Sequence, residues 1–166
     1  RVSAGCSHRA TWRIQNRRGS SRRWMKVQWQ VRSNGQNDKA NKLIYSALIE
    51  KIGDDIEEEV SVLICEEKVT CFASYMPYPV HVGEVYQVEL VAVVFNEYFI
   101  EESDELPSIF RTGTDYSYLL TGILGDGNIN CGSIIFFDDL LSEDFGFLRG
   151  KMVSWKVDRL DICFLE

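Results

Sequence analysis

The chain has 166 residues, of which 45% are hydrophobic and 26% charged, a composition typical of a globular protein that can bury one core. No apolar run approaches the roughly 20 residues of a helical membrane span, which excludes a helical integral membrane protein. The formal net charge of −7 opposes binding to nucleic-acid phosphates and favours basic partners.

Residues 1–24 differ from the rest of the chain in charge. They contain seven arginines and no acidic residue, so the other 142 residues hold 11 basic and 25 acidic side chains, a formal charge of −14. The composition changes abruptly at Met25. We interpret residues 1–24 either as a non-native extension, compatible with read-through upstream of a small mobile gene, or as a basic arm. Such an arm would lie on the acidic body of its own or a neighbouring subunit and could form a homodimer.

Residues 25–166 are predicted to form a single acidic β-rich domain. Residues 25–32 alternate apolar and polar side chains, which indicates a half-buried strand. A helix is predicted from Asn37 or Asp38 to Ile52, because its apolar residues fall on one face and Gly53 follows as a stop.

Residues 60–75 are typical of a hairpin with a turn at Glu66 and Glu67. A long strand is expected over residues 84–95, and its second half is apolar on both faces, which predicts burial on both sides. Residues 96–115 are polar and acidic and are predicted to form a long loop.

A second hairpin is expected around the turn at residues 125–128, whose Asp-Gly step suits a tight turn. Residues 138–147 are interpreted as another acidic excursion. In the last segment, residues 151–165, the apolar positions change parity at Asp158 and Arg159, which predicts a β-bulge or sharp bend there. The fold is therefore expected to be mainly β, a coiled antiparallel sheet or small β-barrel of about 7–8 strands with one N-terminal helix packed against it.

No combination of reactive residues indicates an enzyme. His81 has no nucleophile motif near it, and residues 126–130 begin like a calcium loop but lack its glycine and final carboxylate. The carboxylate clusters lie in predicted loops, where charges are usually solvated. We therefore expect no catalytic residue, no metal site and no cofactor. The five cysteines are predicted to be free, buried thiols, which favours a cytoplasmic location.

Two groups of residues are candidates for binding. Asp158, Arg159 and Asp161 lie at the predicted bend, where an arginine near an aromatic ring makes a versatile contact, although a structural arginine–carboxylate pair that ties two strands together is the competing interpretation. The aromatic residues Trp29, Tyr86 and Trp155 could line the mouth of a barrel, with core packing as the alternative.

The acidic body favours a non-enzymatic binding protein that engages a basic protein partner, of the immunity or inhibitor type. One alternative is a small-molecule-binding barrel that uses the three aromatic residues. Another is an OB-like module for oligonucleotides or oligosaccharides, of which the nucleic-acid version is opposed by the charge.

Overall fold

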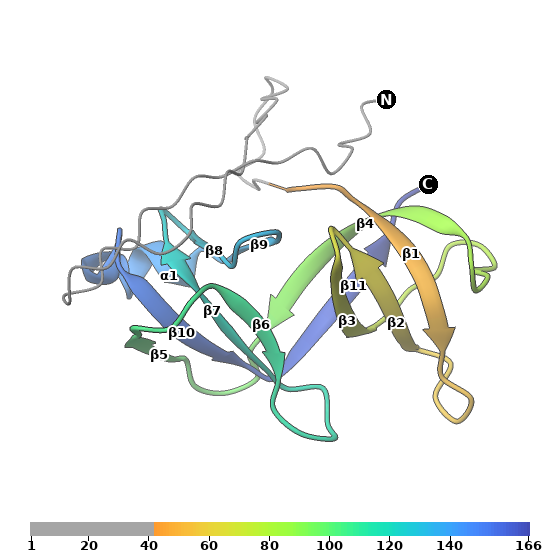
Figure 1. Ribbon diagram of the computed structural model, residues 1–166, viewed down its shortest axis with the longest axis horizontal. Helices are drawn as coiled ribbons and strands as arrows, with labels where there is room; N and C mark the ends of the chain where they lie inside the picture. The colour runs from red at the N-terminus through yellow and green to blue at the C-terminus, as the bar shows by residue number, and fades with distance from the viewer. Residues whose placement is uncertain (1–41) are drawn as a thin grey trace.

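A computed structural model of the chain describes residues 42–166, and most of its regular structure there is β-strand. A closed five-stranded barrel and a six-stranded second sheet lie side by side (Figure 1). The prediction of a mainly β fold with a barrel is confirmed. The described residues contain eleven strands, however, so the expected number of seven or eight was too low.

The barrel is formed by the first four strands of the described chain and its last one. Its strand order is β1-β2-β3-β11-β4, and pairing between β1 and β4 closes it. Strand β11 runs parallel to β3, whereas the other neighbours are antiparallel. The predicted hairpin is confirmed as β2 and β3, with a turn at Cys65 and Glu66, both of which have positive φ. The strands are β1 (Tyr45–Ile52), β2 (Glu59–Ile64), β3 (Glu67–Phe72), β4 (Val85–Val93) and β11 (Arg159–Phe164).

The predicted N-terminal helix is wrong where the structure describes it, because Tyr45–Ile52 is strand β1. Its apolar residues occupy both parities of the sequence, so a helical stripe could be drawn through them. Hydrogen bonding to β2 on one edge and β4 on the other decides for the strand, and Tyr45, Ala47 and Ile49 then point into the core. The described residues do contain one α-helix, α1 (Leu140–Glu143), far from the predicted place.

The second sheet is built entirely from the connection between β4 and β11. Residues 96–115 are therefore not a single loop, since they contain β5 and β6, and residues 138–147 contain α1. The hairpin around residues 125–128 is confirmed by the pairing of β7 with β8. The elements are β5 (Phe99–Glu102), β6 (Ser108–Arg111), β7 (Tyr118–Leu124), β8 (Asn128–Asn130), β9 (Ile135–Phe137), the 3-10 turn η1 (Gly146–Leu148) and β10 (Met152–Val157).

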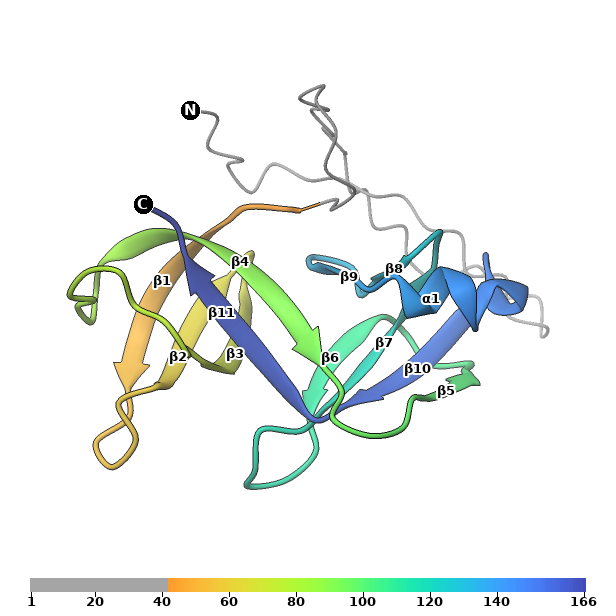
Figure 2. The same ribbon diagram turned by 180° about the vertical axis from the view of Figure 1, so that it is seen from behind.

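The predicted bend at Asp158 and Arg159 is confirmed. Strand β10 ends in the second sheet at Val157, and β11 begins in the barrel at Arg159, with Asp158 as the bent residue between them. The view from behind shows the two strands meeting at this corner (Figure 2). The change of parity in the sequence thus marks the point where the chain passes from one sheet to the other.

The barrel and the second sheet share one hydrophobic core. Two buried phenols join them: the Tyr45 hydroxyl accepts a hydrogen bond from the Ile135 N–H at 3.0 Å, and the Tyr118 hydroxyl accepts one from the Thr70 N–H at 2.8 Å. The predicted two-sided burial of the second half of this strand, residues 90–95, is wrong, because Val91 is 40% exposed and Phe95 is 60% exposed. Val91 faces outward from β4, and Phe95 follows the end of this strand.

Several predictions fall outside the described residues 42–166. These are the arm over residues 1–24 with its homodimer, the strand over residues 25–32 with Trp29, and the start of the predicted helix. Among the described helices, none has the length and apolar character needed to cross a membrane.

Candidate interaction site at the end of the second sheet

The three polar residues at the bend each have a fixed partner. The Asp158 carboxylate accepts a hydrogen bond from the Phe95 N–H at 2.7 Å, which fastens the bend to the end of β4. The Arg159 guanidinium donates two hydrogen bonds to Asp161, at 2.5 and 2.9 Å. This pair lies within one strand, so it does not tie two strands together as the structural interpretation had assumed.

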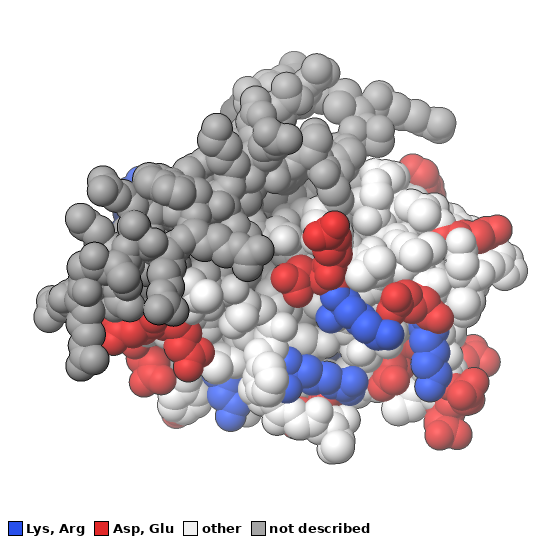
Figure 3. Space-filling model, in the orientation of Figure 1, with Lys and Arg blue, Asp and Glu red and all other residues white. Residues whose placement is uncertain are grey.

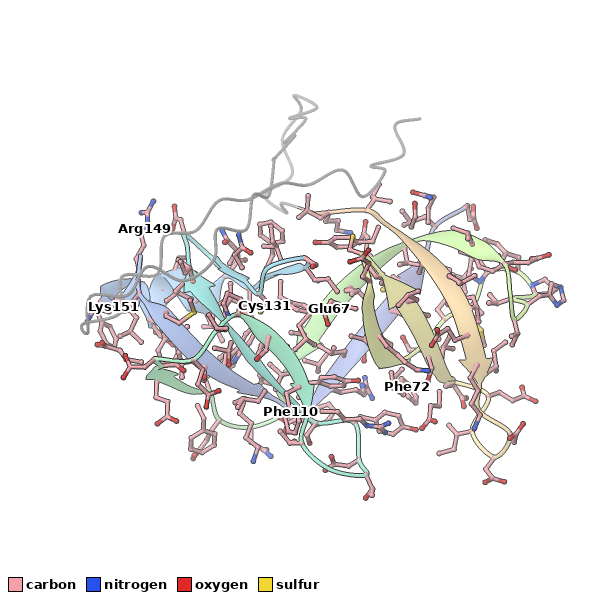
Figure 4. All side chains as sticks on the ribbon, in the orientation of Figure 1. Glu67, Phe72, Phe110, Cys131, Arg149 and Lys151 are labelled. Carbon is pink, nitrogen blue, oxygen red and sulfur yellow. The ribbon has the colours of Figure 1, made fainter. Side chains whose placement is uncertain are left out.

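Arg159 is also held between two aromatic rings. Its guanidinium carbon lies 4.4 Å from the centre of the Phe72 ring and 5.3 Å from that of Phe95. Phe72 in turn meets the edge of Tyr116, which stands before β7. Figure 4 shows Phe72 on the barrel and Phe110 on the second sheet, at the same lower side of the molecule. The bend cluster therefore packs across the junction of the two sheets.

Trp155 lies on β10 within the second sheet and not at a barrel mouth. Its side chain is fully buried, and within the described residues its indole nitrogen has no hydrogen-bond partner. The indole stacks on Tyr98 at 5.9 Å between ring centres and an interplanar angle of 16°. Trp155 is thus the inner end of an aromatic series that the sequence pattern alone could not reveal.

This series, which we call the aromatic ladder, consists of Trp155, Tyr98, Phe145 and Phe147. Tyr98 stacks on Phe145 at 6.3 Å, and Phe145 meets Phe147 at 6.4 Å. Phe147 is 75% exposed, so the ladder runs from the core to the surface. An exposed ring supported by stacked rings is a typical anchor for a protein partner.

Carboxylates stand next to two ladder residues in the sequence, Glu97 before Tyr98 and Asp144 before Phe145. The Tyr98 hydroxyl donates a hydrogen bond to Asp138 at 2.7 Å, which brings the segment before β5 next to the segment before α1. Burial and this carboxylate both raise the pKa of Tyr98, so it stays protonated as a donor. We call the carboxylates of residues 97–105 and 138–144 the acidic end: Glu97, Glu101, Glu102, Asp104, Glu105, Asp138, Asp139, Glu143 and Asp144.

Almost all of the acidic end lacks a cationic partner among the described residues. The one salt bridge there joins Glu102 to Lys151, which directly precedes β10. Figure 4 shows Lys151 at the end of the molecule that carries β5. The space-filling view shows acidic side chains gathered at the end that carries β5 (Figure 3). A second exposed ring, Phe99, stands among them.

A family model matches residues 43–165, a span that includes every strand described above. The chain belongs to the family described as uncharacterised conserved protein UCP019853. Both the barrel and the second sheet of this UCP019853 protein lie within the matched span. No curated protein and no solved structure matches the chain.

Tyr86 belongs to the barrel strand β4, whereas Trp155 belongs to β10 of the second sheet. Tyr86 stacks on Tyr78 at 5.7 Å, and its hydroxyl donates to Glu84. Tyr78, but not Tyr86, lines a hollow of about 490 Å³ between the β1–β2 and β3–β4 connections. The structure therefore does not bring Tyr86 and Trp155 to one barrel mouth, and Trp29 lies outside the described residues.

The described His, Cys, Asp and Glu side chains bear on the predictions of no metal site and of free thiols. No group of three or more His, Cys, Asp or Glu in residues 42–166 could hold a metal ion. Cys71 and Cys131 are free and buried as predicted, and burial raises the pKa of both thiols, which disfavours the nucleophilic thiolate. Cys163 is free but exposed, and Cys65 is not one of the free thiols, so the prediction is wrong for these two.

Proposed function

We propose that the protein is a non-enzymatic binding protein that engages a basic protein partner through the acidic end, as an inhibitor or immunity protein does. Its charge supports this proposal. Residues 42–166 hold 24 acidic and eight basic side chains, a formal charge of −16, and six of the eight basic residues already contact a carboxylate. A surface with this surplus attracts a basic partner and speeds its association.

The observation that carries the proposal is that charge and exposed rings occur together in the same two segments, residues 97–105 and 138–147. Eight of the nine carboxylates of the acidic end have no salt bridge in the described structure, and the two segments that carry them also carry the exposed rings of Phe99 and Phe147. Exposed aromatic side chains supply apolar contact area in protein interfaces, while the surrounding charges select the partner. The acidic β1–β2 connection has the charges but one exposed apolar side chain, Ile56, and no exposed aromatic ring.

Two matched triple variants test the proposal. One neutralises the acidic end with Glu101→Gln, Asp104→Asn and Glu105→Gln, and the control neutralises the β1–β2 connection with Asp55→Asn, Glu57→Gln and Glu58→Gln. Both variants lose the same charge. With oligolysine as the probe, we expect fluorescence anisotropy to show roughly tenfold weaker binding for the first variant, at a few tenths of a kcal/mol per exposed ion pair, and little change for the control.

Equal weakening in the two triple variants would show that net charge alone attracts the probe, and it would contradict a defined site. Phe147→Ser adds an independent check, because the ring is largely exposed and its loss should leave stability within about 0.5 kcal/mol. We expect the same substitution to weaken binding of an oligolysine that carries apolar residues.

A second candidate function is an OB-like module for a neutral oligosaccharide. OB barrels have five strands and bind ligands across their second and third strands and adjoining loops. The closed barrel of this chain also has five strands, and Phe72 of β3 lies beside Arg159 and Phe95 on its outer side. Saturable binding of an oligosaccharide that Phe95→Ala abolishes would support this candidate. The negative charge of the described residues opposes the nucleic-acid version of the module.

The small-molecule alternative can be tested at the hollow of about 490 Å³, which is open to solvent and lined in part by Asp54 and Glu57. A thermal-shift screen with metabolites tests it, since a ligand of the native state raises the apparent stability. We also propose a cytoplasmic location, which the buried free thiols of Cys71 and Cys131 support.

A further inference from the structure

Strand β5 has one edge that no described strand covers. It pairs with β10 on one side, and the N–H of Ser103, just after β5, donates to the Met152 carbonyl at 2.9 Å. Bonded and non-bonded pairs alternate along an antiparallel ladder. The backbone N–H and C=O groups of Ile100 and Glu102 therefore face away from β10, and they have no backbone partner within residues 42–166.

We propose that this edge of β5 receives an extended basic segment of the partner, which pairs with β5 as an additional strand. The inference rests on the proposed function and specifies the conformation in which the partner binds. An exposed strand edge offers main-chain hydrogen bonds to any extended peptide, and side chains beside it determine which peptide is accepted.

The side chains of β5 favour a basic segment with apolar residues between its charges. Phe99 and Glu101 project from one face of the strand and Glu102 from the other, and Phe99 is 60% exposed. Glu97 precedes the strand and Asp104 follows it, so carboxylates continue beyond both ends. Cross-strand neighbours of opposite charge stabilise a strand pair, and an apolar residue beside Phe99 adds contact area.

The same side chains disfavour a second copy of this chain as the occupant. In a symmetric antiparallel pair of two β5 edges, either Glu101 would lie opposite Glu101 of the other copy or Glu102 opposite Glu102, and like charges directly opposite destabilise a strand pair. Each copy also carries the charge of −16 over residues 42–166. The edge is therefore protected from self-association and open to a segment of opposite charge.

A pair of synthetic peptides tests strand addition apart from charge attraction. The first is a short peptide with blocked ends in which lysine and valine alternate. The second is identical except for N-methyl groups on alternate backbone nitrogens, which leave its charge unchanged and remove the donors on one edge. Binding of both to the full chain is measured by fluorescence anisotropy, and protection of the Ile100 and Glu102 amides by hydrogen exchange.

We expect the unmethylated peptide to bind roughly tenfold more tightly, as the loss of one or two net hydrogen bonds implies, and to protect both amides. Glu101→Lys should weaken its binding by about the same factor, whereas Glu57→Lys in the β1–β2 connection should not. Equal binding of the two peptides would overturn strand addition and leave charge recognition standing. Binding of neither would overturn both proposals. Protection of both amides before peptide is added would also overturn the proposal, because the edge would already be occupied. Protection that rises with protein concentration would indicate a second copy as the occupant, and protection independent of concentration would indicate this chain's own N-terminal segment.

Discussion

The hydroxyl of Tyr45 joins the barrel to the second sheet, and its removal measures how strongly the two are coupled. Tyr45 is buried, and its hydroxyl oxygen accepts the Ile135 N–H at 3.0 Å while lying 3.5 Å from the Ile135 carbonyl. In Tyr45→Phe the ring stays but the buried N–H loses its partner. An unsatisfied buried donor costs about 1–3 kcal/mol, so we expect the free energy of unfolding at pH 7 to fall by this amount.

The pH dependence of this difference has a definite sign. Burial, the largest cause, raises the pKa of Tyr45 from 10.0 to about 12. Below pH 10 the phenol is protonated in both folded and unfolded chains, so its full contribution is present. Above pH 10 the unfolded chain loses the proton first, and the contribution is lost as pH rises towards 12, by about 1.4 kcal/mol per pH unit.

Guanidinium denaturation of the full chain, followed by circular dichroism from pH 7 to pH 11, checks both statements. The stability gap between the natural protein and Tyr45→Phe should narrow above pH 10. Tyr75→Phe is the matched control, since Tyr75 is 67% exposed and its substitution should change stability by less than about 0.5 kcal/mol. Equal stability of Tyr45→Phe and the natural protein at pH 7, or a gap that widens at high pH, would refute the reasoning.

Two further substitutions test the corner and the second sheet. Arg159→Met should destabilise the protein by about 2–4 kcal/mol, because the Asp161 carboxylate loses both hydrogen bonds. Adding Asp161→Asn should recover part of this loss of stability. A double-mutant cycle, with unfolding in urea, measures the coupling of the two residues. Gly122→Ala should lower the free energy of unfolding by about 3 kcal/mol or more, since its Cβ would lie 2.1 Å from the Asn130 carbonyl oxygen. Gly146→Ala is the control: its Cβ would meet no atom within 4 Å, so thermal unfolding should change little.

The features that could be predicted from the sequence are those that local patterns determine. The hairpin over residues 60–75 has alternating side chains and a short polar turn, and β2 and β3 pair as expected. The change of parity at Asp158 and Arg159 is also local, and it correctly marks the bend between the two sheets. Both predictions required only the two-residue period of a strand.

The features that could not be predicted depend on contacts between distant segments. Tyr45–Ile52 has apolar residues at both parities, and pairing with β2 and β4 decides its conformation. Strand β5 is short and acidic, with no alternation to indicate a strand before β10 pairs with it. Phe147 did carry a local signal, an aromatic ring within an acidic segment, but its support by Phe145 and Tyr98 follows from packing alone.

The central claim is that the acidic end, rather than the charge of the whole body, binds a basic segment. Titration of the isotope-labelled full chain with oligolysine, followed by amide chemical shifts, tests it most directly. We predict saturable shifts concentrated in residues 97–105 and 138–148 that weaken as salt is added. Shifts spread evenly over the acidic residues, or centred on residues 54–59, would contradict the claim.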